Sequence, residues 1–487
     1  MKRTCPVEIT WQPDKTKQIT MYEQIVQFIC DKAASGIWPV GTRLPAQRVL
    51  AEAFHVNRST IVTALEQLQS MGVITSRGSA GTVIASNTWS LVLPPKASWG
   101  EQISSGNFKS NKAIVQAINR LEFTPHMVRL GTGELDLRLF PQEMLQQALG
   151  AVQQKLTSLG YPEPLGNAAL REAIAAHMQT LGITVSPASI LITSGALQAL
   201  QLIAVSLVAG GSTIYAEAPT YIQSLQVFQS TGLTLRGLPM DEEGVQYWHM
   251  KQGNAGKIAS VLYTIPTNHN PTGITMSAVR REKLLAYCRD QQVPIIEDGA
   301  YEELYFGRQK PLPLKAMDTD GMVIYLGSAS KALAPGLRIG WLIAPEPIVQ
   351  RLSDVKMQVD YGASVLSQVV FTEFLRTGMY DQYTTALRKE LRHRRDAALA
   401  VLDRYYRSFA TWRVPDGGFY IWLTLTKNLS MEQLFATAAK AGILINPGDI
   451  YDFNQNHSLR LSYSYTTPAE FAQGAKTLAK LIVAAPE

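Results

Sequence analysis

The first seventy residues alternate apolar and polar positions with a helical period. In the stretch TMYEQIVQFICDKAASG, the apolar positions that share one helix face are Tyr22, Ile25, Val26, Ile29 and Ala33. Two more helices are expected at about 46–54 and 58–71, joined by the short turn 55–57. Asn57 is placed to cap the second of them.

A β-hairpin is expected next, because the short β-like pieces GVITSR and GTVIAS flank the glycine-rich tip 78–81. A helix, a helix-turn-helix and a hairpin in this order are typical of a winged-helix DNA-binding domain. In such a domain the second helix of the turn pair enters the major groove, and flanking side chains hold phosphates. Any one of these arginines alone would be ordinary surface charge, but together the candidate DNA-binding residues are Arg48, Arg58, Ser59, Thr60 and Arg77.

The pattern changes beyond this domain. Residues 87–125 lack sustained periodicity and are interpreted as a linker with a short helix near 113–121. From residue 128, short apolar strands such as SILITSG, ASVLYTIP and VPIIEDG alternate with helical stretches. This alternation predicts a mostly parallel sheet with helices on both faces. The expected organisation is multi-domain: a winged helix at 15–86, the linker, and an α/β domain at 126–487 whose smaller C-terminal α+β subdomain spans roughly 365–487.

Composition adds little to this picture. Of the 487 residues, 46% are hydrophobic and 17% are charged, as in globular proteins. Three cysteines and the lack of an apolar run of about 18 residues predict a cytoplasmic protein without a membrane span. Residues 1–86 hold nine Lys and Arg against six Asp and Glu, which favours an anionic partner. A second basic run, 388–396, is interpreted as a solvated helix face, with DNA contact as the lesser alternative.

Polar residues follow several strands at the edge where a parallel sheet binds ligands. The amides of Gly195, Ala196 and Leu197 open a helix and could hold a phosphate. Asp298 leaves a very apolar strand, and a buried carboxylate needs a cationic partner or several donors. Tyr221, Asn270 and Tyr301 complete the set, although a packed tyrosine and a turn asparagine are the simpler interpretations of the first two.

The stretch LGSASKALAPGLRIGW suggests the chemistry. Lys331 follows a strand and is surrounded by groups able to bind phosphate, namely Ser328, Ser330 and Arg338. A lysine that bonds to an aldehyde and an aspartate that pairs with a ring nitrogen are the arrangement that holds pyridoxal 5'-phosphate. We therefore predict this cofactor, with Lys331 as the Schiff-base lysine, and no metal.

Two family resemblances agree with this prediction. The motifs LPAQR, LAEAF, VNRST and ALEQL resemble the GntR family of bacterial regulators, although Val62 stands where some members carry a basic DNA-contacting residue. The motifs YPEPLGNAALREAI, NHNPTG, EDGAYEELYFG and SASKALAPGLRIGW resemble class I aminotransferases of pyridoxal-phosphate fold type I.

The second resemblance implies a role for each site residue. Asp298 would pair with the pyridine nitrogen, Asn270 and Tyr301 would hold the ring hydroxyl, and Tyr221 would stack on the ring. The phosphate would be held by Ser328, Ser330 and Arg338, with Tyr161 reaching the phosphate of a neighbouring subunit. Arg460 would bind the carboxylate of a substrate or effector, and Gly133 belongs to the same site.

A chain that carries both resemblances is similar to the MocR subfamily of GntR regulators. This implies a head-to-tail homodimer that binds an operator in double-stranded DNA and senses an amino-acid-like effector through aldimine formation. One departure favours an alternative: many members have tyrosine two residues after the aspartate, whereas position 300 is Ala and Tyr301 follows, as in working aminotransferases. A genuine aminotransferase with an accessory DNA-binding module therefore remains open, and a mere dimerisation scaffold is disfavoured by the intact Lys331, Asp298 and Arg338.

Overall fold

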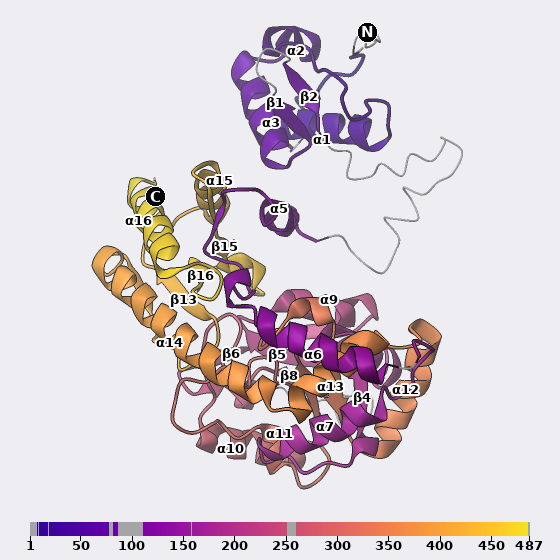
Figure 1. Ribbon diagram of the computed structural model, residues 1–487. Coiled ribbons are helices and arrows are strands. Elements are labelled where there is room, and N and C mark those ends of the chain that lie inside the picture. The colour runs from indigo at the N-terminus through magenta and orange to yellow at the C-terminus, as the bar shows by residue number, and fades with distance from the viewer. Residues whose placement is uncertain are drawn as a thin grey trace. The chain divides into compact units, whose positions relative to one another are not determined.

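The computed structural model describes residues 7, 9–17, 19–76, 81–85, 111–156, 158–250 and 260–485. The chain divides into two compact units, Met1–Phe123 and Thr124–Glu487, shown in Figure 1. Within the described ranges, no helix is both long and apolar enough to cross a membrane. Each unit is described below by itself.

The N-terminal unit is a winged helix, as predicted. Its elements are α1 (Met21–Ala34), α2 (Gln47–Phe54), α3 (Arg58–Ser70), β1 (Ile74–Ser76), β2 (Thr82–Ile84) and α5 (Ala113–Leu121). The strands β1 and β2 pair antiparallel, with Thr75 opposite Val83. Asn57 occupies the N-cap position of α3, but its side chain makes no capping hydrogen bond, so this expected contact is absent.

Apolar side chains from all three winged-helix helices form the core of this unit. The buried residues include Ile25, Ile29, Leu50, Phe54, Ile61, Leu65 and Leu68. They repeat every three or four positions along each helix, which is the spacing of one helix face. Trp11 adds to the core from the segment before α1, because its ring stacks on Phe28 at 4.7 Å between centroids.

The C-terminal unit is built on an eight-stranded, mostly parallel sheet with the strand order β4-β11-β10-β9-β8-β5-β6-β7. Its strands are β4 (Ile190–Thr193), β5 (Thr213–Ala218), β6 (Thr234–Asp241), β7 (Gly244–Val245), β8 (Ser260–Thr264), β9 (Ile295–Asp298), β10 (Val323–Ser328) and β11 (Gly340–Ile343). The pairs β10–β11, β11–β4 and β6–β7 are antiparallel, and the others are parallel. Every residue of β4, β9, β10 and β11 is buried, so both faces of the sheet are covered there.

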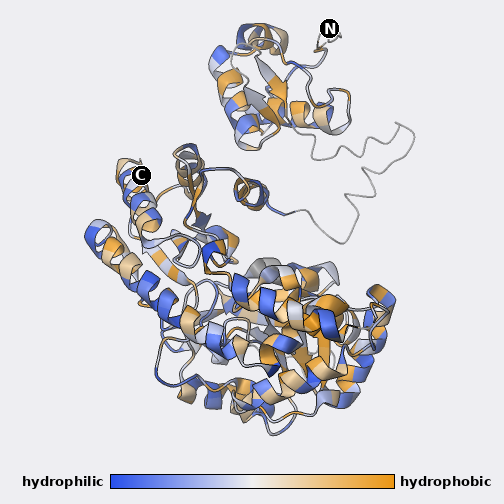
Figure 2. Cartoon of the chain, in the orientation of Figure 1, coloured by the Kyte–Doolittle hydropathy of each residue, from blue (hydrophilic) through white to orange (hydrophobic). Residues whose placement is uncertain are grey.

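Helices provide that cover, and Figure 2 shows the apolar character of the strands beneath them. The helices of this unit are α6 (Gln142–Lys155), α7 (Ala168–Gln179), α8 (Ala196–Ser206), α9 (Ile222–Ser230), α10 (Ala278–Asp290), α11 (Leu314–Met317), α12 (Glu346–Val359), α13 (Val365–Arg376), α14 (Met379–Tyr405), α15 (Met431–Lys440) and α16 (Pro468–Ala484). The helix α8 packs against β4, β10 and β11. Its N-terminus therefore lies at the edge where the parallel strands end.

A smaller antiparallel sheet follows, as the predicted α+β subdomain requires. Its order is β12 (Ala410–Trp412), β13 (Tyr420–Leu425), β16 (Ser458–Ser462) and β15 (Asn446–Pro447). The sequence did not indicate that the start of the unit forms a separate two-stranded sheet with a later strand. The strand β3 (Val128–Arg129) pairs in parallel with β14 (Ile443–Leu444), so residues close to the predicted linker are part of the C-terminal layer.

Candidate functional site

The candidate site residues lie where the parallel strands end. Asp298 is the last residue of β9, Ser328 is the last residue of β10, and Gly195 follows β4 by two positions. Open α/β sheets bind ligands in this place, because the loops that follow the strands meet there. The fold thus brings together side chains separated by more than a hundred residues in sequence.

Asp298 is buried and accepts a hydrogen bond on each carboxylate oxygen. The hydroxyl of Tyr263 donates to Oδ2 at 2.7 Å, and the N–H of Ala300 donates to Oδ1 at 3.0 Å. Burial raises the pKa of Asp298, while both hydrogen bonds and the charge of Lys331 oppose that rise. The two hydrogen bonds therefore fix the orientation of the carboxylate, and the positive charge of Lys331 is close enough to stabilise its charged form.

Lys331 follows β10 by three positions and is partly buried. Its Nζ donates to the carbonyl oxygen of Gly133 at 2.7 Å. Gly133 belongs to residues 131–138, which we call the strap. A Cβ atom on Gly133 would lie 2.6 Å from the hydroxyl of Tyr420, so glycine lets the strap approach the site closely.

Backbone and side-chain donors form an anion cradle at the N-terminus of α8. Gly195 is the N-cap residue with φ of 94°, and the following N–H groups have no partner within the helix. Arg338 donates from Nη2 to the carbonyl of Ser194 at 2.7 Å. A Cβ atom on Gly195 would lie 2.6 Å from the same Nη2, so a side chain here would fill the cradle. Ser328 completes this edge, and its Oγ accepts from the N–H of Ser330 at 3.1 Å.

Asn270 and Tyr301 lie in contact with each other. The Nδ2 of Asn270 lies 3.4 Å from the hydroxyl of Tyr301, which also lies 2.8 Å from the hydroxyl of Tyr420. All three side chains are buried. Burial holds the pKa of Tyr301 well above its ordinary value, so the phenol stays protonated and can donate.

Arg460 lies in β16 and is buried beside the same group. Its Nη1 donates to Oδ1 of Asn270 at 3.0 Å, and its Nη2 donates to the carbonyl of Gly131 at 2.6 Å. The guanidinium carbon lies 4.3 Å from the ring centroid of Tyr420 and 4.6 Å from that of Tyr451. Aromatic faces on both sides fix the orientation of this cation.

Two other predicted residues lie at the margins of the chain's own site. Tyr221 immediately precedes α9, and its ring centroid lies 6.4 Å from that of Tyr451. Tyr161 is 84% exposed and lies beside Tyr361, with 5.1 Å between ring centroids. Its side chain points away from the interior of its own unit. Its predicted contact with the phosphate bound by a neighbouring subunit stays a prediction.

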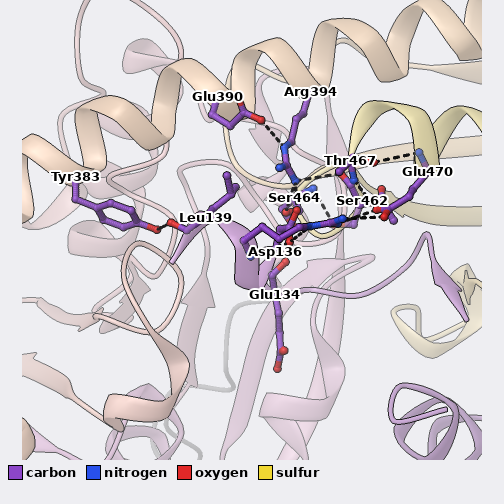
Figure 3. A network of polar contacts seen from close by, with 12 residues as sticks. Glu134, Asp136, Leu139, Tyr383, Glu390, Arg394, Ser462, Ser464, Thr467 and Glu470 are labelled. Carbon is purple, nitrogen blue, oxygen red and sulfur yellow. Dashed lines mark hydrogen bonds and ion pairs between the residues drawn. The ribbon is translucent and has the colours of Figure 1, made fainter. Parts of the chain in front are cut away.

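A network of ion pairs anchors the far end of the strap, as Figure 3 shows. Asp136 accepts from Nη1 of Arg394 at 2.9 Å, and both side chains are about 5% exposed or less. Arg138 donates to both carboxylate oxygens of Glu470, at 2.8 and 2.7 Å. The strap is therefore fixed to α14 and α16 at one end and contacts Lys331 and Arg460 at the other.

The interpretation of residues 388–396 as a solvated face holds for the exposed Lys389, Arg392, His393 and Asp396, but the same network corrects it for three arginines. Arg394 is buried in its ion pair with Asp136. Arg388 is largely buried and donates to the carbonyl of Glu303, and Arg395 donates to that of Pro415. These arginines bind backbone and carboxylate oxygens of their own unit, so a helical pattern of charge alone was misleading.

The candidate DNA-binding residues that are described lie on the winged helix. Arg48 on α2 is 85% exposed and lies 3.7 Å from Glu52. Arg58 and Ser59 are exposed at the first turn of α3, and Thr60 is half-buried. Arg77 and the hairpin tip 78–80 lie outside the described residues. Sequence reasoning missed Arg43, an exposed residue whose guanidinium would lie 2.9 Å from a Cβ atom on Gly81 in the hairpin.

Sequence reasoning also missed Tyr263, Tyr420 and Tyr451. The only signal for Tyr263 was its place in an apolar strand, where a tyrosine is usually core. Tyr420 and Tyr451 come from the small sheet and its neighbouring turn, and no motif links them to Arg460. Their contacts with Arg460 become visible only when the strands of the small sheet are paired in register.

These observations define the class: a winged helix joined to a domain of aminotransferase type. Residues 125–478 match the family model described as aminotransferase class I and II, and residues 21–84 match the bacterial regulatory proteins of the gntR family. The HTH-type transcriptional regulator YisV of Bacillus subtilis is 46% identical over 471 residues, which is 96% of this chain and 97% of YisV. The HTH-type transcriptional regulator NorG of Staphylococcus aureus is 32% identical over 87% of this chain and 95% of its own.

A solved structure extends the comparison to the C-terminal unit. LysN, the alpha-aminoadipate aminotransferase from Thermus thermophilus complexed with N-(5'-phosphopyridoxyl)-L-leucine, has a TM-score of 0.72 and 28% identity. The match covers 80% of this chain and 98% of that one. The chain therefore belongs to the MocR subfamily of GntR-type transcription regulators, whose C-terminal domain has the fold type I aminotransferase architecture.

Proposed function

We propose that this transcription regulator binds pyridoxal 5'-phosphate in its C-terminal unit and uses it to sense an amino compound that carries an acidic group. The observation that carries the proposal is the convergence of an amine, a buried carboxylate and a buried guanidinium. The strap binds both Lys331 and Arg460, and the charge of Lys331 acts on Asp298. A domain used only for dimerisation has no need of this set.

The residues present fit the cofactor. Its phosphate suits the cradle of Gly195, Ala196 and Leu197 with Arg338, Ser328 and Ser330, because amides, hydroxyls and a guanidinium are all donors. Asp298 suits a protonated ring nitrogen, since a buried carboxylate needs a cation. Asn270 and Tyr301 offer donors to the ring hydroxyl, and Tyr221 offers an aromatic face.

The cofactor would supply an aldehyde that a primary amine can bond to, with loss of water. Lys331 is the amine placed to hold it, and the amine of an effector would compete with Lys331 for the same carbon. Arg460 would hold the acidic group of the effector, because a guanidinium binds a carboxylate through two parallel hydrogen bonds. A Cβ atom on Gly133 would lie 3.3 Å from Nη2 of Arg460, so glycine keeps a side chain away from that guanidinium.

The N-terminal unit would bind an operator in double-stranded DNA. Arg58, Ser59 and Thr60 stand at the first turn of α3, where side chains can reach bases, and Arg48 is free to contact phosphate. A head-to-tail homodimer would let Tyr161 complete the partner's phosphate site. We place the protein in the cytoplasm, at its DNA target.

Absorbance spectroscopy tests the proposal. Purified protein is reconstituted with pyridoxal 5'-phosphate, and a panel of amino acids and amines is added while the visible band and operator binding are recorded. We expect a band that Lys331→Ala abolishes and that the exposed control Lys283→Ala retains. A compound that shifts both the band and the affinity for DNA is the effector, whereas an unchanged spectrum in Lys331→Ala would refute the role of Lys331.

A second candidate, a working aminotransferase, is supported by the complete set of Lys331, Asp298, Tyr301 and Arg460 and by the likeness to LysN. Its test is turnover. If an amino acid and the 2-oxo acid of a different amino acid are repeatedly converted into the corresponding 2-oxo acid and amino acid, the domain is an enzyme. If one equivalent reacts and the signal persists, the sensor is favoured.

A further inference from the structure

We propose that Tyr263 is a positioning residue for the cofactor: through Asp298 it keeps a proton on the cofactor's ring nitrogen. This inference rests on the proposed cofactor site. It concerns a residue in the middle of the sheet that no motif of the sequence indicated.

The contact between the two side chains is built into the sheet. Strands β8 and β9 are parallel neighbours, with Tyr263 opposite Ile296, two residues before Asp298. Both side chains are buried, and the hydroxyl of Tyr263 lies 2.7 Å from Oδ2 of Asp298. The short distance is that of a hydrogen bond to a charged acceptor.

The direction of this hydrogen bond is set by the surroundings. Burial and the neighbouring charge of Asp298 hold the pKa of Tyr263 well above its ordinary value, so the phenol donates. Asp298 must then accept, with the N–H of Ala300 as its second donor. Each carboxylate oxygen accepts more than one hydrogen bond, so the pair leaves capacity for a ring N–H.

Among the described residues, few other groups influence the ionisation of Asp298. Lys331, which follows β10, favours the charged carboxylate. Glu217 in β5 also acts on Asp298 and Tyr263, and Tyr221 before α9 acts on Tyr263. Burial raises the pKa of Glu217 to about 7, so Glu217 is only partly charged near neutral pH. Tyr263 donates to the carboxylate directly from its side chain, alongside the backbone N–H of Ala300.

Loss of the phenol has a predictable consequence. Asp298 would keep its burial and lose one of its two donors, so the charged carboxylate would become less stable. The carboxyl group would then compete more strongly for the shared proton, and the ring nitrogen would be protonated less. A ring without that proton withdraws fewer electrons from the Lys331 nitrogen bonded to the cofactor, which raises the pH at which this linkage loses its own proton.

The test is a pH titration of the visible band in protein reconstituted with pyridoxal 5'-phosphate. We expect Tyr263→Phe to move the midpoint upward by about one pH unit, the size expected for one hydrogen bond to a charged group. Tyr406→Phe is the matched control, because Tyr406 is also buried and also donates one hydrogen bond, at 2.6 Å to the carbonyl of Ala475 on α16. Its midpoint should stay at the wild-type value.

A second measurement has a wild-type result that does not depend on the variant folding. The ¹⁵N chemical shift of cofactor labelled at the ring nitrogen should show a protonated nitrogen in the wild type and reduced protonation in Tyr263→Phe. Two results would overturn the inference about Tyr263 and leave the proposed cofactor site standing. They are an unprotonated nitrogen in the wild type, and an unchanged midpoint in a Tyr263→Phe protein of normal cofactor content. Wild-type protein that takes up no pyridoxal 5'-phosphate would overturn the proposed cofactor site itself.

Discussion

Lys331 and Arg460 both bind backbone carbonyls of the strap. Lys331 donates to Gly133 and Arg460 donates to Gly131, at 2.7 and 2.6 Å. A ligand that takes either side chain must therefore replace a hydrogen bond that the protein makes by itself. The two glycines are needed because a side chain at either position would collide with Tyr420 or Asn446.

A buried ionic contact fixes the segment that carries Asp298 and Tyr301. Glu303 lies 3.0 Å from Nε2 of His177 and accepts from Nζ of Lys310 at 2.9 Å. Burial alone would raise the pKa of Glu303, but the bond to His177 and the charge of Lys310 lower it to about 2. Because the folded-state pKa is below the unfolded value, this group stabilises the fold above about pH 4.5, and the contribution is lost as pH falls toward 2.

We expect Glu303→Gln to lower the free energy of unfolding by roughly 3 kcal/mol at pH 7, because the variant cannot ionise. Urea unfolding of the full chain at pH 7 and pH 3.5 measures the effect, and the deficit should shrink at the lower pH. Glu172→Gln is the control, since its pair with Arg376 is more than half exposed and should contribute under about 1 kcal/mol. A deficit that is independent of pH would contradict the ionic explanation.

Single residues also show where sequence reasoning succeeds. Asn270, Tyr301 and Arg460 were named from family motifs, and the fold places Asn270 3.4 Å from Tyr301 and 3.0 Å from Arg460. Tyr263 could not be found in this way, because its partner lies on a neighbouring strand 35 positions away. Pairing between strands depends on the register of the whole sheet, which a local pattern does not contain.

The elements of the N-terminal unit were predictable because each helix buries one periodic face. The same argument explains why Ser59 stays exposed, because it falls on the opposite face of α3 from Ile61, Leu65 and Leu68. Arg58 shares their stripe and is exposed because it is the first residue of the helix. The pairing of β3 with β14 was not predictable, because a two-residue strand carries no period.

Replacing Arg58 by Ala tests the role of α3. The affinity for a DNA duplex selected from random sequences should fall about tenfold, and the salt dependence should weaken by about one released ion if the contact is to phosphate. Electrophoretic or anisotropy titrations at several salt concentrations measure both quantities. Arg407→Ala removes the same charge from an arginine of the other unit that is 74% exposed, and it should leave the affinity unchanged. Equal affinity for both variants would exclude Arg58 from the interface.

The strap is held by the ion pair that Figure 3 displays, and this pair should be costly to break. Asp136→Asn removes the buried carboxylate and leaves Arg394 with the partly exposed Glu390 as its remaining charged partner, so we expect a loss of about 3 kcal/mol in the free energy of unfolding. Asp320→Asn is the matched control, because it breaks an arginine pair that is about half exposed. Urea unfolding of both full-length variants gives the comparison, and equal losses would show that burial of the pair is unimportant.

Sensing connects the two units of the chain through equilibrium binding. If the effector changes the affinity for DNA by some factor, then DNA must change the affinity for the effector by the same factor. We expect this factor to be about 5 to 150, the usual range of coupling free energies. It requires the effector to bind one of two states of the whole molecule more tightly, whatever path connects the units.

Two titrations of the full chain measure this coupling. Effector is titrated against cofactor-loaded protein with and without operator DNA, using the visible band, and DNA is titrated with and without effector. The two ratios should agree, and both should become one in protein without pyridoxal 5'-phosphate, because the effector then has no aldehyde to bond to. Ratios of one in the wild type would mean that ligand binding to the C-terminal unit does not change the affinity of the N-terminal unit for DNA. The aminotransferase alternative would then explain the intact site better than the sensor does.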